Sequence, residues 1–358
     1  MSDVYKRLAT KLDQLPNGFP ATESGVELKI LRRIFAPEEA EMALKLKTIS
    51  ETPEDIAGRL GMPLSETEVM LDNMTKKGQI WSEKKSGKQV YALYPFVIGI
   101  WELQVNRLDK ELSDLMAQYG PVLGLSLGTF SPGVMRVIPI NAPIEAEHKI
   151  LPYEDARQLL ANARTFQVAE CICRKDAALQ GRPCKHTSEV CLSFSSEEGA
   201  FDKYPLGRMI SRQEALDLLA KAEEEGLVHQ TFNAKSDSFA ICNCCSCSCP
   251  VLGATKNFGL PYLTAKSNFV AMINQETCEE CGTCADERCP MDAIAEDNGG
   301  FSVKPERCIG CGVCTTTCPT ESISLIRKPE GQRDEPPENL SDWYSKRAAS
   351  RGIVFTGE

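Results

Sequence analysis

The chain has 358 residues, of which 42% are hydrophobic and 25% charged, and its formal net charge is −10. This length exceeds one ordinary core and predicts several domains, while the negative charge disfavours a protein that coats nucleic acid. Because no run of about 18 apolar residues is present, we expect no transmembrane segment. The N-terminus lacks the basic segment and apolar run of a secretory signal, so we expect a cytoplasmic protein.

Two helices are predicted within the first hundred residues. Residues 37–60 have apolar positions at helical spacing, with Thr52 as an N-cap and Gly61 as the stop. A second helix is predicted from Ser65, its N-cap, with Glu68 three residues later completing a capping box.

Two short strands are predicted on either side of Lys85-Ser86-Gly87, and a longer amphipathic helix over 97–119. The order helix, helix, hairpin resembles a winged-helix domain. We therefore expect residues 1–120 to form a helical, winged-helix-like domain.

The next segment, 121–164, is rich in glycine and proline and predicts an irregular connector with a strand over 134–140. Strands FQVAECICR and SFAICNC, with a helix N-capped by Ser211 between them, predict a small α/β middle domain over 165–265. Residues 329–358 are polar and contain prolines, so an extended or partly disordered tail is expected.

All 17 cysteines lie between Cys171 and Cys318, and CNCCSCSCP, residues 242–250, places five of them in nine positions. In a large chain without an export signal, such density favours metal binding over disulfide bonds. The number is odd, so complete pairing within one chain is impossible.

Two cysteine runs form an internal repeat offset by 30 residues: CEECGTCADERCP at 278–290 and CIGCGVCTTTCP at 308–319. The spacing resembles the bacterial ferredoxin run, in which three cysteines bind one [4Fe-4S] cluster and the fourth binds the other. A pair of zinc knuckles is the alternative. The resemblance implies a 2[4Fe-4S] ferredoxin fold over 266–328. It implies one cluster on Cys278, Cys281, Cys284 and Cys318, and a second on Cys308, Cys311, Cys314 and Cys289.

The first run departs from the pattern, because Ala285 to Arg288 make a four-residue spacer where three are usual. An insertion of one residue need not abolish ligation, but it could change the hydrogen bonds to the cluster and its potential.

Nine further cysteines precede the tandem runs, and we expect them to bind one or two additional Fe-S clusters. Residues i and i+2 of a strand share a face, which predicts two thiol pairs, Cys171 with Cys173 and Cys242 with Cys244. A structural zinc ion, redox disulfides and free thiols are the alternatives. The candidate ligands are Cys171, Cys173, Cys184, Cys191, Cys242, Cys244, Cys245, Cys247 and Cys249.

Three polar residues beside these cysteines have competing interpretations. His186, two residues after Cys184, is interpreted as a surface or hydrogen-bonding histidine rather than a ligand. Arg174 and Lys175 either neutralise a thiolate-bound cluster or form a solvated basic pair.

AECICR, ICNCC and the tandem runs together resemble a family of multidomain 4Fe-4S dicluster ferredoxin-like proteins of anaerobic bacteria and archaea. The expected fold is α+β and multidomain. The resemblance implies an iron-sulfur electron carrier that serves a redox partner protein or oxidoreductase complex.

The alternative function is an Fe-S redox-sensing winged-helix transcriptional regulator. Residues 1–100 contain 14 Lys/Arg and 14 Asp/Glu, and Glu66 and Glu68 begin the helix that would enter the major groove. DNA binding is therefore disfavoured, and protein docking or homo-oligomer formation is the preferred role of this domain. No dinucleotide loop, P-loop or nucleophile elbow is visible, which favours a carrier or oxidoreductase subunit over an independent enzyme.

Overall fold

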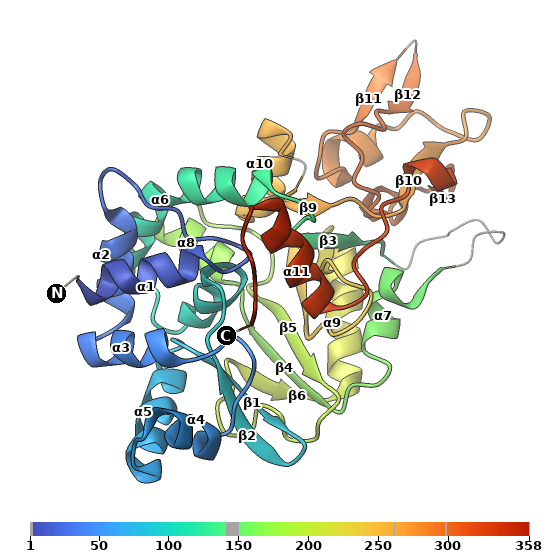
Figure 1. Cartoon of the computed structure of the whole chain (residues 1–358). Coiled ribbons are helices and arrows are strands. Elements are labelled where there is room, and N and C mark those ends of the chain that lie inside the picture. The colour runs from blue at the N-terminus through green and yellow to red at the C-terminus, as the bar shows by residue number, and fades with distance from the viewer. Residues whose placement is uncertain (1–2, 141–149, 261, 298, 358) are drawn as a thin grey trace.

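The computed structural model describes residues 3–140, 150–260, 262–297 and 299–357. Helices of the N-terminal region lie at one side of a central sheet, and the hairpin β11–β12 projects at the opposite end (Figure 1). Within the described ranges, no helix is both long and apolar enough to cross a membrane.

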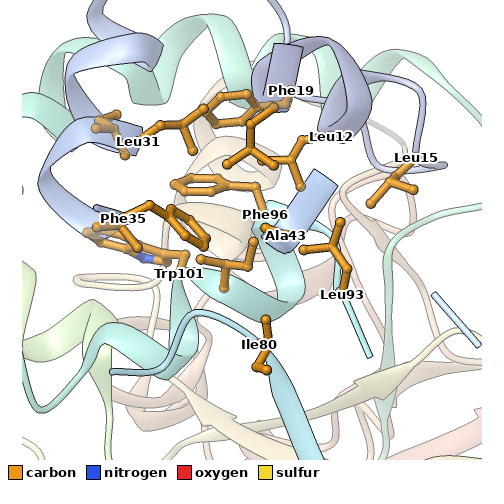
Figure 2. Packing of buried hydrophobic residues seen from close by; sticks show 14 of the residues in the cluster. Leu12, Leu15, Phe19, Leu31, Phe35, Ala43, Ile80, Leu93, Phe96 and Trp101 are labelled. Atoms are coloured by element: carbon orange, nitrogen blue, oxygen red, sulfur yellow. The ribbon is translucent and has the colours of Figure 1, made fainter. Parts of the chain in front are cut away.

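Five helices and a hairpin form the N-terminal region. Buried side chains from these elements and from the segments that follow them make a shared core (Figure 2). In this core the Phe19 and Phe96 rings lie 4.7 Å apart, with Leu12, Leu31 and Trp101 nearby. The elements are α1 (Val4–Asp13), α2 (Val26–Ile34), α3 (Pro37–Lys45), α4 (Pro53–Leu60), α5 (Leu64–Lys76), β1 (Trp81–Lys85) and β2 (Lys88–Ala92).

Local signals at α4 and the hairpin are present as predicted. The Thr52 side chain accepts a hydrogen bond from the backbone of Asp55, and Gly61 ends the helix at φ +65°. Ser86 and Gly87 form the turn of the hairpin at positive φ. Helix, helix and hairpin therefore occur in the expected order, while the winged-helix assignment itself stays a prediction.

Two helix predictions are wrong. Helix α5 begins at Leu64 after Pro63, so Ser65 lies inside its first turn and is not the N-cap. The helix expected over 97–119 is displaced, because Asp109 caps a later start, its side chain accepting from the Leu112 N–H. The resulting α6 (Lys110–Thr129) continues into the segment expected to be an irregular connector.

The central sheet has seven strands in the order β6-β4-β5-β8-β7-β3-β9, antiparallel except for the β3–β9 pair. The strand predicted over 134–140 is present as β3, but it belongs to this sheet rather than to a separate connector. The strands are β3 (Met135–Ile138), β4 (Thr165–Glu170), β5 (Glu189–Ser195), β6 (Arg208–Ile210), β7 (Val228–Phe232), β8 (Ala240–Cys244) and β9 (Thr264–Ala265).

Helix α9 (Arg212–Glu224) begins at the predicted N-cap Ser211, which forms a capping box with Glu214, and packs on the sheet through Ala215 and Leu219. Shorter helices, α7 (Ala156–Leu159), α8 (Ile172–Leu179) and α10 (Pro250–Phe258), complete this part. Two of them begin directly after a cysteine, since Cys171 is the N-cap of α8 and Cys249 the N-cap of α10.

The C-terminal region contains two antiparallel strand pairs that hold the tandem cysteine loops. One pair is β10 (Phe269–Ile273) with β13 (Ile323–Arg327), and the other is β11 (Ile294–Asp297) with β12 (Gly300–Val303).

The tail predicted to be extended contains a helix, α11 (Leu340–Ser350), N-capped by Asn339. It crosses the front of the molecule in Figure 1, and its Trp343 and Arg347 are buried. The prediction was wrong because these two side chains find partners far away in the sequence: Trp343 Nε1 donates to the Gly133 carbonyl at 2.8 Å.

We expect Arg347→Ala to destabilise the protein strongly. The Arg347 guanidinium donates to the carbonyls of Leu127, Phe130 and Pro132 at 2.6 to 2.8 Å, so its removal leaves buried acceptors without donors. A loss of about 3 kcal/mol in the free energy of unfolding is expected in urea denaturation. Lys346→Ala on the same helix, where the side chain is 57% exposed, is the matched control and should change stability little. Equal effects of the two substitutions would contradict the prediction.

Candidate metal centres

The second cysteine run gathers around a small cavity of about 20 Å³. Cys308, Cys311 and Cys314 line it together with Cys289, which comes from the first run. Burial raises the pKa of the Cys311 thiol to about 12, and the neighbouring Cys308 and Cys289 add to the shift. Four thiols from two runs thus converge on one enclosed point.

The first run lies closer to solvent, with Cys281 exposed. Burial raises the pKa of the Cys284 thiol, and negative charge on Cys278, Cys281 and Cys318 raises it further. Although burial opposes it, hydrogen bonds from Thr320 and from nearby backbone N–H groups lower the pKa of Cys318 overall. The charge of Cys318 is thus among those that act on Cys284 of the first run.

The four-residue spacer of the first run forms a π-helical turn, Cys284–Arg288, closed by a hydrogen bond of 3.0 Å from the Cys289 N–H to the Cys284 carbonyl. This wider turn accommodates the extra residue. The Arg288 side chain leaves the turn and donates to the carbonyls of Glu223 and Glu224, both at 3.0 Å, at the end of α9. The insertion therefore ties the tandem loops to the central sheet region.

Gly310 permits a close approach of backbone to backbone rather than to a cluster. Its φ is +68°, and a Cβ at this position would lie 2.2 Å from the Phe269 carbonyl oxygen of β10. The packing of this loop against β10 therefore requires a glycine at position 310.

Six of the nine middle cysteines form a closed ring of side-chain contacts, in which each thiol contacts two others. We name this set the six-cysteine ring. In order around it, the members are Cys171, Cys173, Cys249, Cys244, Cys242 and Cys191.

The direction of the pKa shift alternates around the ring, because each thiol interacts with its two neighbours. Its neighbours lower the pKa of Cys171 and Cys249, and they lower that of Cys242 to about 5. The pKa values of the three members between them are raised, again first by the neighbouring thiols.

The strand argument was right for one pair of ring residues and wrong for the other. Cys242 and Cys244 both lie on β8 and contact each other, as period-two alternation predicts. Cys171 and Cys173 also meet, but at the junction of β4 and α8, with Cys173 in the first turn of the helix. The segment AECICR therefore forms a strand end and a helix start, not a continuous strand.

The remaining three middle cysteines form a separate group with His186. Cys184 Sγ lies 3.6 Å from Cys245 Sγ and 3.5 Å from Cys247 Sγ. One donor atom of His186 and the three sulfurs all lie within 4.8 Å of one another. His186 was interpreted as a surface or hydrogen-bonding residue; the surface alternative is wrong, because its side chain is only 18% exposed and one of its ring nitrogens lies among the cysteines, while Glu225 is a polar neighbour at 3.8 Å.

Arg174 lies between the ring and this group. It is buried, donates to the Asn243 carbonyl at 3.0 Å and to the Thr187 carbonyl, and contacts Cys245. Burial lowers its pKa, but the charges of Cys171, Cys245 and Cys184 raise it overall. Of the two interpretations of Arg174, this position supports charge neutralisation. Lys175 instead donates to the Val105 carbonyl at 2.8 Å.

A buried carboxyl beside the ring had no signal in the sequence. Burial raises the pKa of Glu102 to about 8, and the charges of Cys242 and Cys249 contribute. Its carboxylate accepts a hydrogen bond of 2.7 Å from the Gly99 N–H. Glu102 lies in the mostly apolar stretch GIWELQ, which was predicted to belong to a helix over 97–119. Nothing in this stretch indicates that folding brings its carboxyl close to the cysteines.

Tandem cysteine loops of this spacing, in which Cys289 of the first run lines the cavity of the second, are typical of a ferredoxin-type dicluster segment. A family model described as a 4Fe-4S dicluster domain matches residues 270–319. Through this segment the chain belongs to the ferredoxin-type 4Fe-4S dicluster proteins.

Three curated relatives are similar to part of the chain. The chain is 36% identical to pyruvate synthase subunit PorD of Methanocaldococcus jannaschii over 61 residues, which are 17% of this chain and 70% of PorD. It is 30% identical to the electron transport protein HydN of Escherichia coli K12 over 97 residues, 25% of this chain and 55% of HydN. A Streptomyces griseus ferredoxin is 34% identical over 58 residues, 16% of this chain and 49% of the ferredoxin. The chain thus spans about half the length of HydN and of that ferredoxin.

No solved structure matches the chain.

Proposed function

We propose that this protein carries single low-potential electrons between a donor and a partner oxidoreductase through three [4Fe-4S] clusters. Two clusters occupy the tandem loops, on Cys278, Cys281, Cys284 and Cys318 and on Cys308, Cys311, Cys314 and Cys289. The third occupies the six-cysteine ring.

The observation that carries this proposal is that Cys289 of the first run lines the cavity of the second run. We propose that Cys318 completes the first run in return, so that the fourth thiol is exchanged, and its charge contributes to the raised pKa of Cys284. Independent zinc knuckles would have no need of such an exchange, because each would be completed by its own four cysteines. Two adjacent cubes that share their loops do need it.

A third cluster in the ring follows from a count of thiols. A [4Fe-4S] cluster takes four thiolates, and the ring supplies six, which is enough for one such cluster and too few for two. Cys244 and Cys249 of the ring belong to the same buried core as Cys308, Cys311 and Cys314. This shared core supports an electron path from the ring to the second tandem cluster.

Solvent exposure indicates which end of this electron path contacts the redox partner. The first tandem site contains the exposed Cys281, whereas Cys308, Cys311 and Cys314 are buried. Exposure and hydrogen bonds to sulfur set cluster potentials, so the two tandem clusters should differ in potential. The exposed site is the natural place for a partner to exchange electrons.

For the N-terminal region we propose a docking role, with the winged-helix assignment as part of that proposal. On α5, Val69 is 62% exposed and Glu66 lies in the first turn, a surface better suited to a protein than to phosphates. The alternative within this proposal is that the N-terminal region binds a second copy of the same chain and forms a homo-oligomer.

The experiment is a reductive titration of protein purified without oxygen. Each cluster takes up one electron, so we expect about three electrons per chain, returned in full to an added acceptor. Retention of DNA that depends on its sequence would instead support a regulator. Uptake of no electrons would overturn the carrier proposal.

A further inference from the structure

The group formed by Cys184, His186, Cys245 and Cys247, which we name the Cys3His group, has the composition of a structural zinc site. Structural zinc is almost always four-coordinate and tetrahedral, and three cysteines with one histidine are a common ligand set. The ligands come from two separate loops, each supplying two donors with one residue between them.

The sulfur positions fit one metal ion. Four ligands placed about 2.3 Å from a zinc ion at the corners of a tetrahedron lie roughly 3.8 Å from one another. Cys184 Sγ is 3.6 and 3.5 Å from the other two sulfurs, and all four donors lie within 4.8 Å. In a [4Fe-4S] cube each cysteine binds a different iron, so the width of the cluster holds the sulfurs farther apart.

The surroundings match a mononuclear site in charge and in support of the histidine. Zinc with three thiolates carries one net negative charge, and the buried Arg174 that contacts Cys245 supplies one positive charge. Glu225 Oε2 lies 3.8 Å from His186 Nδ1, where a carboxylate can orient an imidazole that binds metal through its other nitrogen. Thr187 fixes that carboxylate, its N–H donating at 2.8 Å.

From this geometry we infer that the Cys3His group binds one zinc ion, separate from the iron-sulfur clusters. The ion joins the loop at residues 184–187 to the loop at 245–249. Cys244 of the six-cysteine ring comes directly before the second loop, and Cys249 of the ring is the last residue of that loop. Zinc therefore holds these two ring residues in place without taking part in electron transfer.

The test measures zinc and iron together in the full-length holo-protein. We expect about one zinc per chain in the wild type. Cys247→Ala and His186→Ala should each lose that zinc and retain all of the iron, whereas His186→Cys should retain zinc through a fourth thiolate. Cys281→Ala is the matched control, because Cys281 is also exposed but belongs to the tandem loops, and it should lose iron and retain zinc.

A second measurement does not depend on the folding of any variant. X-ray absorption at the zinc edge of the wild-type protein should show three sulfurs at about 2.3 Å and one nitrogen at about 2.0 to 2.1 Å. Absence of zinc from the wild-type protein, or loss of about four irons in Cys247→Ala, would overturn the inference. Neither result would affect the tandem clusters, whose status the Cys281→Ala control reports independently.

Discussion

The double variant Cys289→Ala/Cys311→Ala should lose no more iron than either single variant. The two residues lie in different runs but line the same cavity, so each substitution removes a ligand of the same cluster. All three variants should lose about four irons per chain and retain the EPR signal of the other reduced tandem cluster.

The matched comparison is Cys284→Ala/Cys311→Ala. Here each substitution affects a different cluster, so the double variant should lose about eight irons, twice the loss of a single variant. If the pair Cys289 and Cys311 behaved in this additive way instead, the fourth thiol would not be exchanged between the runs.

Cys249→Ala should have the second large effect, removing about four irons while both tandem signals persist. Cys249 contacts its ring neighbours Cys173 and Cys244, and its side chain is buried at the start of α10. Since the ring shares a core with the second tandem site, electrons entering at the ring should no longer reach the acceptor at the wild-type rate.

Stopped-flow reduction with iron analysis measures both parts of this prediction. Ser248→Ala is a suitable control, because Ser248 adjoins Cys249 in the same loop but its hydroxyl lies 3.7 Å from Cys247 Sγ. An unchanged iron content in Cys249→Ala would contradict the prediction that Cys249 is one of the four ligands of a ring cluster.

Signals confined to a few neighbouring residues were reliable in this chain. Thr52 and Ser211 cap helices, and Ser86-Gly87 turns a hairpin, because each interaction closes within one turn of backbone. The tandem runs are also local, and their spacing alone predicted the segment that the 4Fe-4S dicluster model matches.

Features that depend on distant partners could not be predicted in this way. The polar tail forms α11 because Trp343 and Arg347 reach backbone carbonyls near residue 130. The prediction placed Cys173 on a strand, since AECICR alternates like one, whereas the chain turns into α8 after Cys171. His186 looked isolated because two of its three neighbouring cysteines follow about sixty residues later.

The middle cysteines show the same limit most clearly. Spacing alone suggested up to two additional clusters from nine thiols, with no basis for dividing them. Folding separates six thiols in the ring from three beside His186, so that one cluster and one zinc ion become the proposal. Composition predicted metal, and only tertiary structure assigned the thiols to groups.

The most direct test of the central claim is the iron and acid-labile sulfide content of wild-type protein purified without oxygen. Three [4Fe-4S] clusters predict about twelve of each per chain, in a brown protein whose EPR signals appear on reduction. Colourless protein without sulfide, or with zinc in the tandem loops, would contradict the account.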